Sequence, residues 1–163
     1  NLYVTPVTRT EFMLGKQLPY VALAMLNFLL MTLLAVTVFG VPITGSFLAM
    51  ALGALVYSFC ATGIGLLASS VTNSQIAAMF FAMIGTMIPA VQFSGLVNPV
   101  SSLQGSSRLI GEIYPATHMI SISRGAFNKA LGFADLYPSM FPMLLAVPLI
   151  IGTAIALLRK QDR

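Results

Sequence analysis

The sequence contains three long uncharged blocks: PYVALAMLNFLLMTLLAVTVFG (residues 19–40), SFLAMALGALVYSFCATGIGLLAS (residues 46–69) and QIAAMFFAMIGTMIPAVQF (residues 75–93). No charged residue occurs between Lys16 and Arg108. Because burying a charge in hydrocarbon is costly, a membrane-spanning chain must avoid charge over such a length, and a soluble chain has no reason to do so. Each block has the roughly 20 residues that a helix needs to cross about 30 Å of hydrocarbon. The blocks therefore predict three transmembrane helices.

A fourth apolar block, residues 139–158, is followed by the charged terminus Arg159-Lys160-Gln161-Asp162-Arg163. The composition agrees with a membrane protein, since 58% of the residues are apolar and 7% are charged, against roughly 45–50% and 25% in soluble domains. The net charge of +4 is better explained by basic residues at membrane flanks than by nucleic acid binding. We therefore predict an all-α fold: a single membrane domain over residues 1–163 with four transmembrane helices.

Residues 1–18 are expected to form a cytoplasmic helix that leads into the first span. Thr8 and Glu11 have the spacing of a capping box, which predicts a helix start there. Arg9, Glu11 and Lys16 are expected to lie in water, and Pro19 to kink or restart the helix because it lacks an N–H group. Two interpretations remain open: a juxtamembrane lead-in, or a docking element for a cytoplasmic partner.

Residues 94–138 differ from the spans because they carry several ionisable side chains: Arg108, Glu112, His118, Arg124, Lys129 and Asp135. We expect an extracytoplasmic segment here. One helical face within it is formed by Met119, Ile122, Ala126 and Ala130. That pattern predicts a short amphipathic helix at the membrane surface.

Lysine and arginine are distributed unevenly between the two sides that four spans define. The terminal segments hold Arg9, Lys16, Arg159, Lys160 and Arg163, and the segment before the last span holds Arg108, Arg124 and Lys129. Cytoplasmic loops retain basic residues, so this bias places both ends of the chain in the cytoplasm.

Small residues recur every four positions along the second block: Ala49, Gly53, Tyr57, Ala61, Gly65 and Ser69. Such a stripe lets helices approach closely in lipid. We favour packing over a pore and assign Gly53, Ala61 and Gly65 to it. Asn27 in the first block should face neighbouring helices, because an amide is costly in lipid.

The third block places Met79, Met83 and Met87 on one face. Ordinary packing is the favoured interpretation. The alternatives are a route for an apolar substrate and a soft-metal site, which has no Cys or His beside it.

Catalytic and metal-binding patterns are largely missing. The sequence has no Gly-x-x-x-x-Gly-Lys-Ser/Thr loop for nucleotide phosphates. Its one His, one Cys and four dispersed carboxylates do not suit a metal site. Ser94-Gly95 with His118 invites comparison with an intramembrane serine protease, but His118 lies in the polar segment. We expect no enzyme, no metal and no cofactor in this chain. Asn1 is not an initiator Met, so we expect part of a longer protein.

Several short motifs resemble the type-2 ATP-binding-cassette (ABC) exporter permeases, in order and over essentially the whole chain. Near the start these are Thr5-Pro6-Val7-Thr8-Arg9-Thr10-Glu11-Phe12 and Gly15-Lys16. Later ones are Pro89, Gln92-Phe93-Ser94-Gly95, Pro99, Tyr114-Pro115-Ala116-Thr117-His118 and Arg124-Gly125. The chain is most similar to the C-terminal four-span part of one permease half. Within the family it resembles the membrane region of bacterial ribosome-associated ATPases, in which two cassettes precede the permease.

The resemblance implies a permease region in the bacterial inner membrane that moves an amphiphilic or lipid-like substrate outward. The implied partners are ATP-binding cassettes, which hold ATP and Mg²⁺, a second permease half, the lipid bilayer and, through fused cassettes, the ribosome. It places cassette coupling near Thr8, Arg9, Glu11 and Lys16. It implies a re-entrant signature at Ser94, Gly95, Pro99, Pro115, His118 and Arg124. The alternative is a structural membrane anchor for ribosome-associated cassettes that transports nothing.

Overall fold

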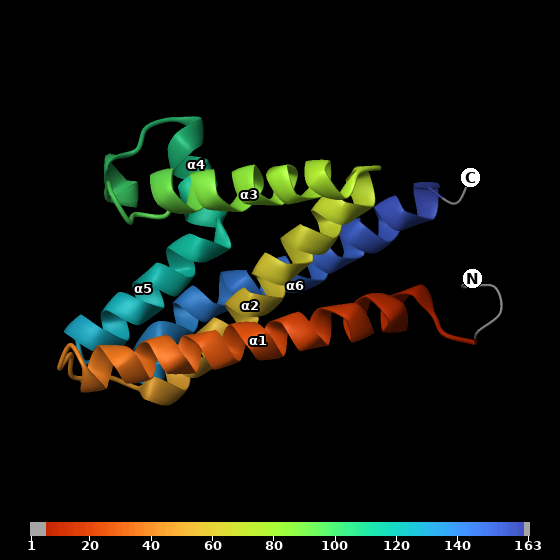
Figure 1. Ribbon diagram of the computed structural model, residues 1–163. Coiled ribbons are helices and arrows are strands. Elements are labelled where there is room, and N and C mark those ends of the chain that lie inside the picture. The colour runs from red at the N-terminus through yellow and green to blue at the C-terminus, as the bar shows by residue number, and fades with distance from the viewer. Residues whose placement is uncertain (1–5, 162–163) are drawn as a thin grey trace.

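The computed structural model describes residues 6–161, with side chains for residues 6–157. This part of the chain contains helices and no strands (Figure 1). The elements are α1 (Arg9–Thr37), α2 (Phe47–Val71), α3 (Gln75–Gln92), the 3-10 helix η1 (Val100–Ser102), α4 (Ser106–Ile113), α5 (Pro115–Asn128) and α6 (Phe133–Gln161). Four of them, α1, α2, α3 and α6, are long and apolar enough to cross a membrane. The predicted all-α fold with four transmembrane helices is confirmed.

Helix α2 is the centre of the bundle, because it packs against α1, α3, α5 and α6. The buried core joins three elements, with these side chains: Ala49 and Met50 of α2, Ile122 and Ala126 of α5, and Leu136, Met140 and Met143 of α6. The start of α1 and the end of α6 lie at the same end of the bundle (Figure 1). We call this the terminal end. The opposite end, which holds α4 and the loop between α1 and α2, is called the distal end.

Helix α1 runs without a break from Arg9 to Thr37, with Pro19 inside it. The expected entry helix and the first span are therefore one continuous helix that does not restart at Pro19, and the membrane boundary at residue 19 stays a prediction. In lipid every backbone group needs a partner within its own segment, so a helix that loses one hydrogen bond at proline still gains by continuing. Residues 1–5 of the predicted lead-in lie outside the described part of the chain.

Helix α6 begins at Phe133, earlier than the predicted start at residue 139. The carboxylate of Asp135 accepts a hydrogen bond from the backbone N–H of Gly132 at 3.2 Å. Leu136 donates its N–H to the carbonyl of the same glycine at 3.2 Å. These bonds fix the helix start at Phe133, ahead of Pro138.

The short amphipathic helix expected within residues 94–138 corresponds to α5, which packs into the bundle and does not lie on its surface. Helices α4 and α5 form a hairpin that turns at Tyr114, with η1 before it and the first turn of α6 after it. Ile122 and Ala126 are completely buried against α2 and α6, because they face the bundle. Ala130 lies beyond the end of α5 and has a φ of 51°, so it does not extend the apolar face.

Helix α3 has no buried residue within the described chain. Met79, Met83 and Met87 are 67%, 51% and 61% exposed, so the favoured packing interpretation does not hold among the described helices. Asn27 of α1 is also exposed, and it lines a hollow together with Tyr57 of α2 and Met119 of α5, in agreement with the predicted orientation toward neighbouring helices.

Candidate functional site

The start of α1 is held by a reciprocal capping box. The Thr8 hydroxyl accepts a hydrogen bond from the Glu11 N–H at 3.3 Å, and the Glu11 carboxylate accepts from the Thr8 N–H at 2.8 Å. The hydroxyl also donates to the same carboxylate at 2.8 Å. Both residues are exposed and Arg9 is half-buried. The helix start is therefore capped against fraying, while its polar surface stays accessible.

One stripe of this first stretch of α1 faces the bundle. Met13, Gln17 and Val21 are buried, at four-residue intervals along the helix. Lys16 lies outside the stripe and is exposed, and its ammonium nitrogen is 5.5 Å from the centroid of the Phe12 ring. The coupling candidates Thr8, Glu11 and Lys16 thus lie on accessible surface at the terminal end.

At the distal end, the junction after α3 is tied to α5. Gly95 has a φ of 84°, which suits glycine, and its carbonyl accepts a hydrogen bond from the Arg124 guanidinium at 3.0 Å. Ser94 is buried, and its hydroxyl donates to the carbonyl of Ala90. Pro99 leads into η1, and its carbonyl accepts from the N–H of Ser102 at 2.9 Å. These residues form the turn that starts the hairpin.

The apex of the hairpin lies between α4 and α5. Pro115 is buried at the first turn of α5, a position where a missing N–H costs little. Burial lowers the pKa of His118, which favours the neutral ring, and its Nε2 lies 2.9 Å from the carbonyl oxygen of Glu112. The neutral tautomer with hydrogen on Nε2 donates to this carbonyl near the end of α4. His118 therefore has a structural role here, and the geometry does not bring it to Ser94 as a catalytic pair.

Tyr114 anchors the apex; the sequence analysis named it within a motif but assigned it no contact. Its hydroxyl donates to the carbonyl of Thr86 on α3 at 3.0 Å. Thr86 lies about 9 Å along α3 from its end at Gln92, given a rise of about 1.5 Å per residue. The hairpin thus returns well into the depth of the bundle before α5 leads back to the distal end. A single tyrosine beside a proline gave no pattern from which this contact was predictable.

The loop between α1 and α2 packs against the end of α5 and the residues after it, at the distal end. Gly45 donates its N–H to the carbonyl of Ala126 at 2.8 Å, and Ser46 donates to the carbonyl of Leu131 at 3.1 Å. A Cβ atom on Gly45 would lie 2.6 Å from the oxygen of Leu131, so only glycine permits this approach. These contacts also went unpredicted, because the partners are about 80 residues apart in the sequence.

The small residues of the stripe on α2 do not all face the same neighbour. A Cβ on Gly53 would lie 3.1 Å from Cδ1 of Ile122, so this glycine lies against α5. Ala61 is half-buried and lines a hollow between α1 and α2. Gly65 has no described atom within 4 Å of its Cβ position and lines a cavity at the terminal end. Gly63 is not part of the stripe, but a Cβ added to it would lie 2.9 Å from Cγ2 of Ile150 on α6.

Within the described part of the chain, no group of three or more His, Cys, Asp or Glu residues is placed to hold a metal ion. Cys60 is buried, and its thiol contacts the carbonyl of Met143 at 3.5 Å. The described geometry is that of a polytopic membrane domain: a helix bundle with a capped start on one side and a hairpin on the other.

Comparison with known proteins defines the class further. The sequence profile of the ABC-2 type transporter family matches residues 1–128. The probable multidrug ABC transporter permease YbhS of Escherichia coli strain K12 is 33% identical over 126 residues, which cover 77% of this chain and 33% of that protein. The inner membrane transport permease YhhJ of the same strain is 30% identical over 146 residues, which cover 88% of this chain and 38% of that protein. The ABC transporter G family member 20 of Dictyostelium discoideum is 24% identical over an alignment of 165 residues, which covers 100% of this chain and 22% of that protein.

No solved structure shows a significant match. The chain spans less than half the length of these curated relatives. This chain belongs to the ABC-2 type transporter family, and it is a membrane permease domain of that family.

Proposed function

We propose that this domain forms part of an exporter that moves an amphiphilic or lipid-like substrate outward, driven by ATP hydrolysis in partner cassettes. ATP and Mg²⁺ belong to those cassettes and not to this chain. The proposed location is the bacterial inner membrane, with the terminal end of the bundle in the cytoplasm. Cassettes in the cytoplasm would then face the start of α1.

The observation that carries the proposal is the capped start of α1. The capping box limits fraying of this segment, which is continuous with the first span and packs against α2, so we expect a push on its surface to pass along α1 to α2. Glu11 and Lys16 are exposed there, at the end where the chain holds most of its basic residues. A flexible lead-in would absorb such a push, whereas a capped helix does not.

A second permease half is the other proposed partner. Support comes from α3, which has no buried residue in the described chain and exposes Ile76, Met79, Phe80, Met83 and Met87. Lipid or a second half could cover this surface. The alternative function, an anchor for ribosome-associated cassettes, gains no support from the relatives, whose names describe transport permeases.

The direct test is transport by the complete protein reconstituted into vesicles together with its cassettes. Labelled amphiphiles and lipids should move from the cassette side to the opposite side only when ATP is hydrolysed. A complex that hydrolyses ATP and moves none of a broad amphiphile panel would contradict the export proposal and favour the anchor.

Glu11 allows the coupling role to be separated from the helix cap. Glutamine retains the capping oxygen and removes the charge, so Glu11→Gln should preserve insertion while export falls by about tenfold. Glu11→Ala loses both the cap and the charge. Glu112→Gln, which removes an exposed carboxylate at the distal end, is the matched control and should leave export unchanged.

The measurements are membrane insertion, ATPase stimulation by substrate, and export. If Glu11→Gln exports as the wild type does and only Glu11→Ala is impaired, Glu11 acts through the helix cap alone. That result would show that no contact with a cassette depends on the negative charge of Glu11.

A further inference from the structure

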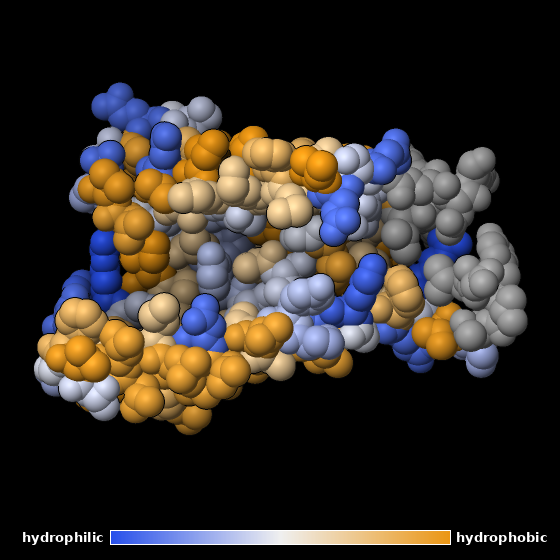
Figure 2. Space-filling model, viewed as in Figure 1, coloured by the Kyte–Doolittle hydropathy of each residue, from blue (hydrophilic) through white to orange (hydrophobic). Residues whose placement is uncertain are grey.

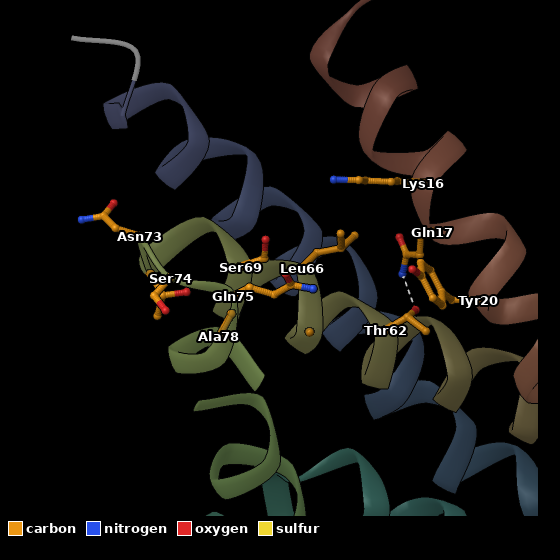
Figure 3. Close-up of a pocket in the computed structure, with 12 residues that line it drawn as sticks. Lys16, Gln17, Tyr20, Thr62, Leu66, Ser69, Asn73, Ser74, Gln75 and Ala78 are labelled. Carbon is orange, nitrogen blue, oxygen red and sulfur yellow. Dashed lines mark hydrogen bonds between the residues drawn. The ribbon is translucent and has the colours of Figure 1, made fainter. Parts of the chain in front are cut away.

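A cavity of about 610 Å³ with several polar side chains in its lining lies between α1, α2 and α3 at the terminal end. Figure 3 shows Lys16 extending from α1 into the space beside α2 and α3, while Gln17 points to Thr62 on α2. The polar side chains that line the cavity include Lys16, Gln17, Tyr20, Thr62, Ser69 and Gln75. No residue of the hairpin and neither residue of the capping box is among those that line the cavity.

Gln17 is the unusual residue of this cavity, since it is 1% exposed. Its amide nitrogen donates to the carbonyl of Phe59 at 2.8 Å and to the hydroxyl of Thr62 at 2.9 Å. Its amide oxygen has no hydrogen-bond partner among the described residues. Buried polar atoms are nearly always paired, so an unpaired oxygen calls for a donor. Gln17 is one of the residues that line the cavity, but its amide oxygen is enclosed, so a donor group of a bound molecule reaches this oxygen only after the amide turns toward the cavity.

The opposite wall of the cavity suits an anion. Helix α3 starts there; the side chain of its N-cap residue Ser74 makes no capping hydrogen bond, and the first turn holds no acidic residue. The free N–H groups and the helix dipole both favour a negative charge at this position. Lys16 contributes a positive charge from α1, and no carboxylate is among the described residues that line the cavity.

The surroundings of the cavity are apolar. Leu18 on α1 follows the lining residue Gln17, and Ile76 on α3 follows the lining residue Gln75; they are 55% and 68% exposed. Figure 2 shows hydrophobic side chains over α1 and α3, with a hollow of more polar residues between them. A molecule with an anionic head and apolar tails matches this combination, whereas a small soluble anion leaves the apolar flanks unused.

We propose that this cavity binds the head group of an anionic phospholipid that carries a hydroxyl group, as phosphatidylglycerol does. The phosphate lies between Lys16 and the first turn of α3, and a head-group hydroxyl donates to the amide oxygen of Gln17. This binding goes beyond the transport function, since it needs neither ATP nor cassettes.

The test is lipid retention by the complete protein, purified without cassettes and measured by native mass spectrometry. The probes are phosphatidylglycerol, phosphatidylmethanol, which has the same charge and no hydroxyl, and phosphatidylcholine. The wild type should prefer phosphatidylglycerol over phosphatidylmethanol by about three- to tenfold, the loss expected for one hydrogen bond. Lys16→Gln should bind both anionic lipids about tenfold more weakly, and Lys129→Gln, at the distal end, should bind as the wild type does.

Three results would overturn the proposal. Unchanged retention of phosphatidylglycerol by Lys16→Gln would place the bound lipid elsewhere. Equal retention of phosphatidylmethanol would show that no donor reaches Gln17. Competition by inorganic phosphate at the same concentration as the lipid would identify a site for a soluble anion rather than for a lipid head group.

Discussion

Replacing Gly53 with leucine should lower the free energy of unfolding by about 1–3 kcal/mol, the usual cost of overpacking a filled core. A Cβ alone at this position would lie 3.1 Å from Cδ1 and 3.4 Å from Cγ2 of Ile122, which is itself completely buried. The longer side chain must therefore push α5 away from α2. Thermal unfolding of the purified protein in detergent measures the effect.

Gly65→Leu is the matched control, because it makes the same change on the same helix. Its Cβ position has no described atom within 4 Å, so the leucine enters open space and the melting temperature should stay at or above that of the wild type. If both variants melt as the wild type does, α5 does not pack on Gly53. If both are equally destabilised, Gly65 is covered by something outside the described contacts.

The second large effect is expected at Gly111 in α4. A Cβ there would lie 2.5 Å from the backbone oxygen of Phe93, and backbone cannot move aside as a side-chain tip does. Val100 and Leu103 lie close behind, at 3.2 and 3.4 Å. Gly111→Val should therefore detach α4 from the end of α3, destabilising the protein and abolishing export through loss of the hairpin.

Gly152→Val serves as the control for this variant, since Gly152 is exposed on α6 and no described atom lies within 4 Å of its Cβ position. It should fold and export normally. Protease sensitivity of residues 94–114 in membranes reports the hairpin directly and should rise in Gly111→Val alone. A Gly111→Val protein that resists protease and exports as the wild type does would contradict the contact.

The four spans were predictable because lipid imposes a simple constraint: a long uncharged block has to form a helix. The stripe on α2 was less informative, and the reason is geometric. At 3.6 residues per turn, a four-residue step turns the helix by about 40° beyond a full circle, so three steps separate Gly53 from Gly65 by about 120°. The two glycines therefore face different neighbours, and Gly63 reaches α6 instead.

The hairpin was not predictable in its three-dimensional form. Met119, Ile122 and Ala126 gave the correct apolar face, but a polar segment beside a membrane suggested the surface as its location. Helix α5 is held in the bundle by contacts between residues that are far apart in the sequence. These are Ile122 with Gly53, the Arg124 guanidinium with Gly95, and the loop at Gly45 with the end of α5. No periodicity within one segment encodes such pairings.

The central claim is a four-span permease domain whose terminal end lies in the cytoplasm. Single cysteines at two exposed positions test it: Asn73→Cys between α2 and α3, and Gln104→Cys between η1 and α4. Cys60 is buried and should add little background. In intact cells a membrane-impermeant maleimide should label Gln104→Cys, and it should label Asn73→Cys only after the membrane is permeabilised. Labelling of both cysteines from the same side, or of Asn73→Cys alone in intact cells, would contradict the account.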